Sequence, residues 1–200
     1  MTGTRSGTHA LFSLEHSRAA YWADFGCYGL ASATMGLALL LASPPGHGMA
    51  LAGWAAVGMV TWTLAEYLLH RFVLHGLPPF NRWHAEHHRR PAALIGSPTL
   101  LSASLFAVLA AAPAAWLLGA WPGCALLFGL VTGYLLYGLS HHAMHHAMSP
   151  ALQRWPWLAR RRRWHARHHR AGSSPGGHFG VTSGLWDRVF DRLGRSAQRP

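Results

Sequence analysis

Four long apolar stretches constrain the fold of this chain more than any other feature of its sequence. The hydrocarbon core of a bilayer is about 30 Å thick, so a helix needs roughly 20 apolar residues to cross it. Stretches of this length, nearly free of charge, run from about 21 to 42, 49 to 69, 97 to 118 and 121 to 140. The last two are separated by "GAWPG", which predicts a turn because a single helix over both would overshoot the membrane. We therefore expect an all-α membrane protein with four transmembrane helices in two hairpins.

The distribution of arginines along the chain predicts the membrane topology. The chain carries a formal net charge of +11, and its basic side chains, all of them arginines, fall within residues 1–20, 71–96 and 141–200. The two opposite loops hold none, so the positive-inside rule places the arginine-rich segments in the cytoplasm. We therefore read the charge as a topology signal and not as a nucleic-acid site, since no nucleic-acid-binding module surrounds it. Arginine without lysine indicates a GC-rich bacterial genome, and hence a bacterial cytoplasmic membrane.

An eight-residue word occurs twice, as "RWHAEHHR" (Arg82–Arg89) and "RWHARHHR" (Arg163–Arg170). Each word follows one predicted hairpin, and each hairpin ends in a histidine pair. Because both hairpins enter and leave the membrane on the same side, all four histidine clusters are expected at one face. We expect residues 1–200 to form one integral-membrane domain, with a helical cytosolic cap from 70–96 and 141–193. The segment "VTSGLWDRVFDRL" has apolar residues near helical spacing and predicts a short amphipathic helix lying on the domain.

The spacing of the histidines indicates a metal centre. Within each word they fall at i, i+3 and i+4, on one face of a helix. Imidazole suits iron, zinc, copper and nickel, and ten rings are too many for one ion. Divided between two ions they give about five ligands each, which fits a catalytic dinuclear site better than a closed structural zinc. The candidate ligands are His70, His75, His84, His87, His88, His141, His145, His165, His168 and His169.

The first pair does not fit a regular helix. His70 and His75 are five residues apart and would diverge, so we expect the helix to end between them or a metal to lie on either side. Metal-bound histidines usually donate their second N–H to a carboxylate or carbonyl. The acids expected in that role are Glu66, Glu86 and Asp187, with Tyr137 as a possible hydroxyl contributor; Glu86 and Asp187 could equally pair with surface arginines.

Five segments together resemble a known family: "EYLLHRFVLH", "WHAEHHRRP", "LSHHAMHH", "WHARHHR" and "HFGVTSGLWDRVF". They are similar to the fatty acid hydroxylase and sterol desaturase superfamily of integral-membrane oxygenases, and more to its fatty acid 2-hydroxylase branch than to the sterol or carotenoid branches. The resemblance covers about residues 21–193. It implies four membrane helices under a cytosolic cap, with the ten histidines binding two metal ions. These are iron in the active enzyme, although purified imidazole sites also accept zinc.

The implied function is a membrane-bound di-iron monooxygenase that uses O2 to hydroxylate a lipid, most simply a fatty acid or acyl chain. Residues 1–20 are too short for an attached haem domain, and there is no GxGxxG motif. We therefore expect electrons from a separate protein of the cytochrome or ferredoxin type. Three alternatives remain open: a desaturase or hydroxylase of sterols, carotenoids or other lipids, a histidine-rich metal transporter, and a metal-free scaffold that binds lipid headgroups.

Overall fold

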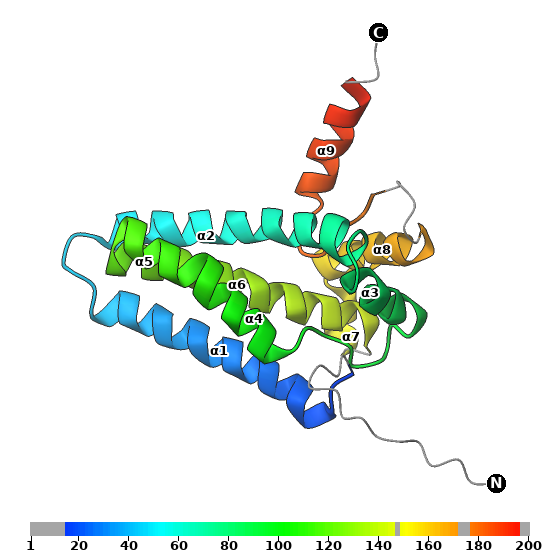
Figure 1. Cartoon of the computed structure of the whole chain (residues 1–200), viewed down its shortest axis with the longest axis horizontal. Helices are drawn as coiled ribbons and strands as arrows, with labels where there is room; N and C mark the ends of the chain where they lie inside the picture. Colours follow the sequence, from blue (N-terminus) through cyan, green and yellow to red (C-terminus); the bar gives the residue numbers. More distant parts are fainter. Residues whose placement is uncertain (1–14, 147–148, 172–176, 197–200) are drawn as a thin grey trace.

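The computed structural model describes residues 15–146, 149–171 and 177–196, and these form a bundle of helices with a smaller helical cap at one end (Figure 1). Four helical segments are long and apolar enough to cross a bilayer: α1 (Arg18–Leu41), α2 with η1 (Gly48–Leu74), α4 to α5 (Thr99–Leu118) and α6 (Ala120–His145). No more than 33% of the most apolar stretch of any span is buried within the protein, which leaves much apolar surface that a bilayer could cover. The predicted all-α, four-span membrane protein is confirmed.

The third span contains one irregular turn. It consists of α4 (Thr99–Phe106), the π-helical turn η2 (Ala107–Ala111) and α5 (Ala112–Leu118). Pro113 lies two residues after the end of η2 and has no N–H to donate, which accounts for the local departure from α-helical hydrogen bonding. The predicted turn comes at Gly119, whose φ of 81° is readily adopted only by glycine. The chain then reverses into α6.

The tightest helix packing is between α2 (Gly48–Leu68) and α6. A Cβ atom on Gly129 would lie 2.0 Å from the carbonyl oxygen of Ala55, and one on Gly58 would lie 2.1 Å from that of Leu126. These glycines let the two backbones touch, as small residues do in membrane bundles, where lipid provides no hydrophobic drive for association. The α2–α6 pair forms the centre of the bundle, and α1 and α5 pack on α6.

The second and fourth spans extend beyond the predicted ends at about 69 and 140. The second continues as η1 (Leu69–Leu74), and α6 continues to His145. At 1.5 Å per residue, segments of 27 and 26 residues are about 40 Å long and exceed the thickness of the hydrocarbon core. Hydropathy marks only the part inside the bilayer, so it missed these last turns. They carry both histidine pairs out of the apolar region.

The cap is formed by α3 (Phe80–Arg89), α7 (Pro150–Arg154) and α8 (Pro156–Ala171). Figure 1 shows all three at the end of the bundle where α2 and α6 finish. The two repeated words occupy α3 and α8, and α3 ends at Arg89, two residues before Pro91. Both words are therefore helical, as the spacing of their histidines predicts.

The last helix, α9 (Leu185–Ser196), differs in position from our expectation. The sequence predicts a short amphipathic helix lying on the domain, and the helix is present. Its first turns pack on α2, where the Trp186 indole donates to Thr63 Oγ1 at 3.0 Å and Phe190 stacks on Tyr67. Beyond this contact α9 projects away from the bundle (Figure 1). Amphipathic spacing identified the helix but not its direction.

The α2–α6 packing can be tested by substitution. Gly129→Ala places a methyl group against the Ala55 carbonyl, and we expect it to lower the free energy of unfolding by roughly 1–3 kcal/mol. Thermal unfolding in detergent micelles measures this effect. The control is Gly53→Ala on the same helix pair, because a Cβ there meets no atom within 4 Å. Equal melting temperatures for the two variants would contradict the proposed backbone contact.

Candidate metal centre

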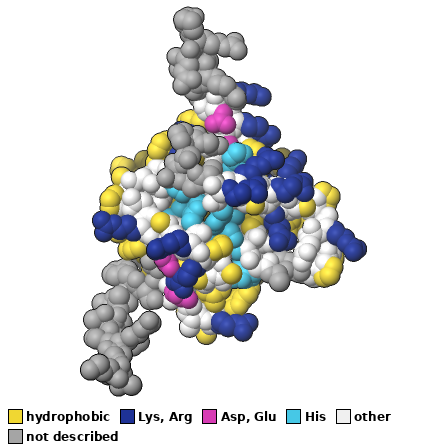
Figure 2. Space-filling model, turned by 90° about the vertical axis from the view of Figure 1, so that its right-hand side faces the viewer, with side chains coloured by type: hydrophobic (Ala, Val, Ile, Leu, Met, Phe, Trp, Pro, Cys, Tyr) yellow, Lys and Arg dark blue, Asp and Glu magenta, His cyan; other side chains and the backbone are white. Residues whose placement is uncertain are grey.

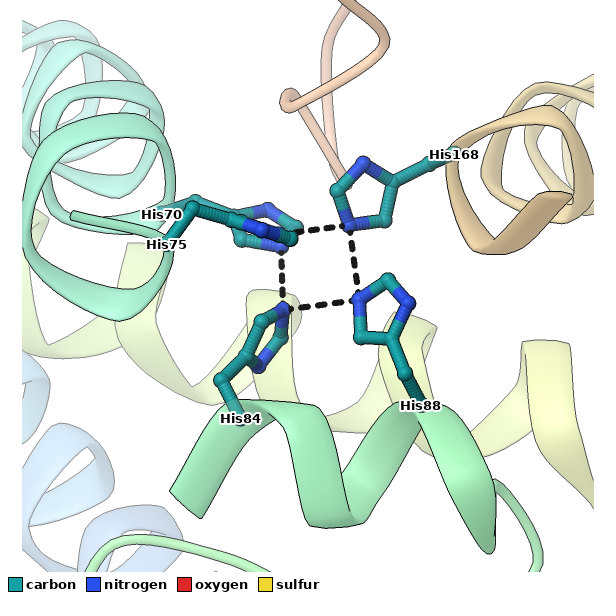
Figure 3. A group of neighbouring side chains, drawn as sticks. All are labelled: His70, His75, His84, His88 and His168. Atoms are coloured by element: carbon teal, nitrogen blue, oxygen red, sulfur yellow. Dashed lines mark hydrogen bonds between the residues drawn. The ribbon is translucent and has the colours of Figure 1, made fainter. Parts of the chain in front are cut away.

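The structure brings all ten candidate ligands together at the cap end of the bundle, in two groups of five. Within each group one nitrogen from every ring lies within 4.8 Å of all the others. The first group, shown in Figure 3, consists of His70, His75, His84, His88 and His168. The second consists of His87, His141, His145, His165 and His169. Both the number of groups and the number of rings per group agree with the division inferred from the sequence.

The two words share their histidines between the groups. From the first word, His84 and His88 enter the first group and His87 enters the second. From the second word, His165 and His169 enter the second group and His168 enters the first. Residues four apart project in nearly the same direction from a helix, whereas the residue between them is turned by about 100° from its neighbour. The middle histidine of each word therefore crosses to the other group.

The first histidine pair is brought together by a π-helical turn. The His75 N–H donates to the His70 carbonyl at 3.2 Å, a hydrogen bond between residues five apart. One extra residue per turn places both rings on the same side, with centroids 5.3 Å apart. Our expectation that the helix ends between them, or that a metal lies on either side, was therefore wrong. In a π-helix the HX4H spacing places two histidines on the same side, just as the HX3H spacing of His141 and His145 does in an α-helix.

Distances between ring nitrogens in the first group fit coordination of one ion. His84 Nε2 lies 3.0 Å from Nε2 of both His70 and His88, and His168 Nε2 lies 3.1 Å from that of His88. Two nitrogens at right angles around a metal, each about 2.1 Å from it, are about 3.0 Å apart. In the second group the corresponding separations from His165 are 2.8 Å to His145 and 3.1 Å to His169.

Burial keeps the cap histidines neutral. It lowers the pKa of His75 and His87 to about 4 and that of His169 to about 3, with neighbouring imidazoles adding to the effect. Near pH 7 each ring therefore retains a lone pair that can bind a cation. His87 is buried, and neither of its ring nitrogens has a hydrogen-bond partner among the described residues. An imidazole so placed is costly unless a metal occupies its lone pair, so the donor set fits bound metal.

One ligand is oriented by a backbone carbonyl. His70 Nδ1 donates to the carbonyl oxygen of Phe179 at 2.6 Å, and since a carbonyl can only accept, the proton must be on Nδ1. The lone pair on Nε2 then faces the other rings of the first group, which is the arrangement that metal-bound histidines require. Phe179 was missed from the sequence because a carbonyl contributes through its position in the fold, whatever side chain it carries.

Two buried carboxylates hold the loop that contains Phe179. Asp187 accepts from the N–H groups of Phe179 and Gly180 at 2.7 and 3.0 Å, and Glu66 accepts from that of Thr182 at 2.9 Å. Both acids are at most 3% exposed. We expected these acids to accept hydrogen bonds from the histidine rings, but they accept from backbone N–H groups of the loop instead. They fix the loop, and the loop orients His70.

The other two candidates have different surroundings. Glu86 lies on the outer side of α3 and pairs with Arg89 and Arg90, so it is the surface pair that the sequence left open. Tyr137 lies one turn before His141 on α6, and the two rings are parallel within 5°. Tyr137 therefore lies beside the second group, and it also lines a cavity that adjoins the histidines.

A cavity of about 160 Å³ connects both groups with the membrane helices. Its wall includes His84 from the first group and His87 and His141 from the second. The remaining wall is largely apolar and aromatic, and comes from α1, α3, α4, α6 and the segment 95–98: Phe25, Phe80, Trp83, Ile95, Leu101 and Leu135 are representative. The cavity thus brings apolar side chains of the membrane helices next to the histidines. Beyond helical periodicity, no pattern in the sequence predicts which side chains form this wall.

The loop clamp can be tested independently of activity. Asp187→Ala leaves two buried N–H groups without acceptors, so we expect a loss of roughly 1–3 kcal/mol in the free energy of unfolding. It also frees the Phe179 carbonyl, which should weaken metal affinity roughly 10- to 100-fold. Calorimetry and metal titration measure the two effects. Asp191→Ala, exposed on the same helix, is the control, and an unchanged metal affinity in Asp187→Ala would refute the clamp.

Known proteins resemble this chain in sequence and structure. A family model described as fatty acid hydroxylase matches residues 55–192, which include all ten histidines. A dihydroceramide fatty acyl 2-hydroxylase of Arabidopsis thaliana is 31% identical over 189 residues, covering 86% of this chain and 70% of the plant protein. A ceramide very long chain fatty acid hydroxylase of Schizosaccharomyces pombe is 32% identical over 151 residues, covering 69% of this chain but 41% of the yeast protein.

The fold has a counterpart among solved structures. Full-length scs7p, of which only the hydroxylase domain is visible, matches with a TM-score of 0.66 and 27% identity, over 89% of this chain and 67% of that one. Sequence and structure thus agree with the motifs and the two histidine groups. The chain belongs to the fatty acid hydroxylase family of oxidoreductases, within its 2-hydroxylase branch.

Proposed function

We propose that this protein is a membrane-bound di-iron monooxygenase that hydroxylates the acyl chain of a lipid. The observation that carries the proposal is the cavity whose wall joins ring atoms of both histidine groups to apolar side chains of the membrane helices. An acyl chain in this cavity stays in apolar surroundings while one of its carbons reaches the histidines. The relatives named as 2-hydroxylases favour the carbon next to the carbonyl as the site of reaction.

The two histidine groups would each hold one iron ion, and bound iron would supply the activation of O2 and the oxidation of a C–H bond. The protein itself provides neutral ligands, a fixed geometry and exclusion of water. His70 is held by the Phe179 carbonyl, and Tyr137 and Trp83 border the space next to the ligands. Five imidazoles per ion would leave an octahedral metal one position for O2 or substrate.

We further propose that electrons come from a separate donor protein of the cytochrome or ferredoxin type. The outer surface of the cap carries exposed arginines around the histidines, visible in Figure 2 as dark blue side chains beside cyan ones. Those on α7 and α8 are Arg154, Arg160, Arg163, Arg167 and Arg170. Such a surface favours an acidic partner through electrostatic steering. By the positive-inside rule, the same arginines support a cytoplasmic cap. The use of arginine without lysine supports a bacterial cytoplasmic membrane.

Metal analysis tests the two-ion assignment. Purified protein should contain two tightly held ions per chain, iron in the active form or zinc where zinc is abundant, measured by mass spectrometry of the metals. His87→Ala should lower the content towards one ion, because His87 belongs to only one group. His47→Ala, exposed in the loop between α1 and α2, should leave it unchanged. A wild-type protein with no metal, or with many weakly held ions, would contradict the proposal and favour a scaffold or a transporter.

Lipid analysis tests the reaction. Cells that express the protein should contain hydroxylated acyl species that are absent from cells expressing His168→Ala, since this ring is fully buried in the first group. Mass spectrometry of total lipid extracts, before and after hydrolysis, identifies both the lipid and the hydroxylated carbon. New double bonds, or oxidised sterols or carotenoids in place of hydroxylated acyl chains, would show that the proposed substrate or outcome is wrong.

A further inference from the structure

The cavity contains one charged side chain that the metal centre does not use. Asp24 lies two turns into α1, within a membrane span, and lines the same cavity as His84, His87 and His141. Its Oδ1 atom is enclosed and has no hydrogen-bond partner among the described residues. An ionisable group inside a membrane segment is costly and normally has a partner or a function. The described part of the chain provides no hydrogen-bond partner for this atom, and the cavity beside it offers space in which a ligand could supply one.

The tyrosine hydroxyls on either side of Asp24 along α1 already have hydrogen-bond partners. On the same face of α1, the Tyr21 hydroxyl is 3.1 Å from His142 Nδ1, and the Tyr28 hydroxyl donates to Ser102 at 2.7 Å. These contacts engage the hydroxyls on either side and leave the carboxylate as the free acceptor. The described residues that line the cavity include no arginine. Apart from the proposed metal ions, the described lining therefore offers a hydrogen-bond acceptor and no arginine side chain that could hold an anion.

The depth of Asp24 defines which part of a substrate it would meet. The next residue, Phe25, approaches Gly138 on α6, and Gly138 precedes the ligand His141 by three residues. One helical turn spans about 5.4 Å, so Asp24 lies roughly one turn below the second histidine group. A substrate group bound there is only a few bonds from a carbon at the histidines. That group must belong to the polar end of the lipid, because the relatives act next to the acyl carbonyl.

We propose that Asp24 is a specificity-determining residue, which accepts a hydrogen bond from an uncharged hydroxyl or amide N–H at the polar end of the acyl substrate. This rests on the proposed function for the identity of the cavity as the substrate site. The same carboxylate repels a free fatty-acid anion, because two like charges in an apolar cavity are weakly screened. The preferred substrate is then an uncharged acyl conjugate with a donor near its carbonyl, and not the free acid.

Equilibrium binding to the purified full-length protein in detergent tests this inference. The probes are N-palmitoylethanolamine, an uncharged amide with N–H and hydroxyl donors, and palmitate, at about pH 8 where a free carboxylate is ionised. The wild type should bind the amide more tightly than palmitate. Asp24→Ala should weaken binding of the amide roughly tenfold or more, as expected for loss of a hydrogen bond to a charged acceptor, and should leave palmitate binding unchanged or improved.

Two further variants keep the result interpretable. Asp24→Asn retains the shape and one acceptor, so it should bind palmitate better than the wild type and the amide less well. Asp191→Asn, exposed on α9 and outside the cavity, should match the wild type for both lipids. Metal content equal to that of the wild type shows that each variant is folded. Equal loss for both lipids in Asp24→Ala, or no loss for the amide, would overturn the assignment.

Binding and hydroxylation are measured in parallel, so failures can be told apart. If the wild type discriminates between the two lipids through Asp24 but hydroxylates no lipid, the proposed reaction is wrong and the binding site stands. If the wild type hydroxylates acyl chains while Asp24→Ala binds both probes as the wild type does, the reaction stands and the role of Asp24 is refuted.

Discussion

Ten neutral imidazoles with lone pairs directed at two small regions form an arrangement that is unfavourable without a positive charge at each centre. Their burial prevents protonation, and several ring nitrogens have no donor to satisfy them. Other parts of the structure follow from this requirement. Two membrane helices extend past the bilayer to deliver histidine pairs, a π-helical turn aligns one pair, and buried acids fix the loop that orients His70.

Because of the repeated word, both halves of the chain contribute histidines to each of the two groups. Each half of the chain supplies a pair from a membrane helix and two rings from its own word, and receives the middle histidine of the other word. Neither group can be completed by one half alone, so metal binding would couple the docking of α3 and α8 to each other and to the bundle. The rings of His88 and His169, one from each group, stack with centroids 4.2 Å apart, which shows how closely the two halves meet.

The two sides of the centre differ in a way that suits the proposed reaction. The cavity is lined largely by apolar and aromatic side chains of the membrane helices and α3, and Asp24 is the one acid among the described residues of its wall. The outer surface of the cap is rich in arginine (Figure 2). A lipid and a soluble electron donor would thus approach the histidines from opposite sides, and neither would obstruct the other. The physical basis is the position of the histidines at the end of the membrane-spanning helices, between their apolar side chains and the arginine-rich cap.

The sequence by itself determined the membrane spans, the turn at Gly119, the helical state of both words and the ten histidines that come together. These features depend on local composition and spacing, which hydropathy and helical periodicity describe well. Tertiary structure decided how the ten histidines divide, because that depends on how α3 and α8 cross. It also decided that Glu66 and Asp187 bind backbone N–H groups, that Glu86 pairs with arginines, and that Asp24 faces the cavity. The contact between Glu66 and Thr182 joins residues more than one hundred positions apart and leaves no periodic trace in a single sequence. The partners of Asp187 and Glu86 lie within eight residues in the chain, but which of these side chains is buried and which faces the surface depends on the packed fold.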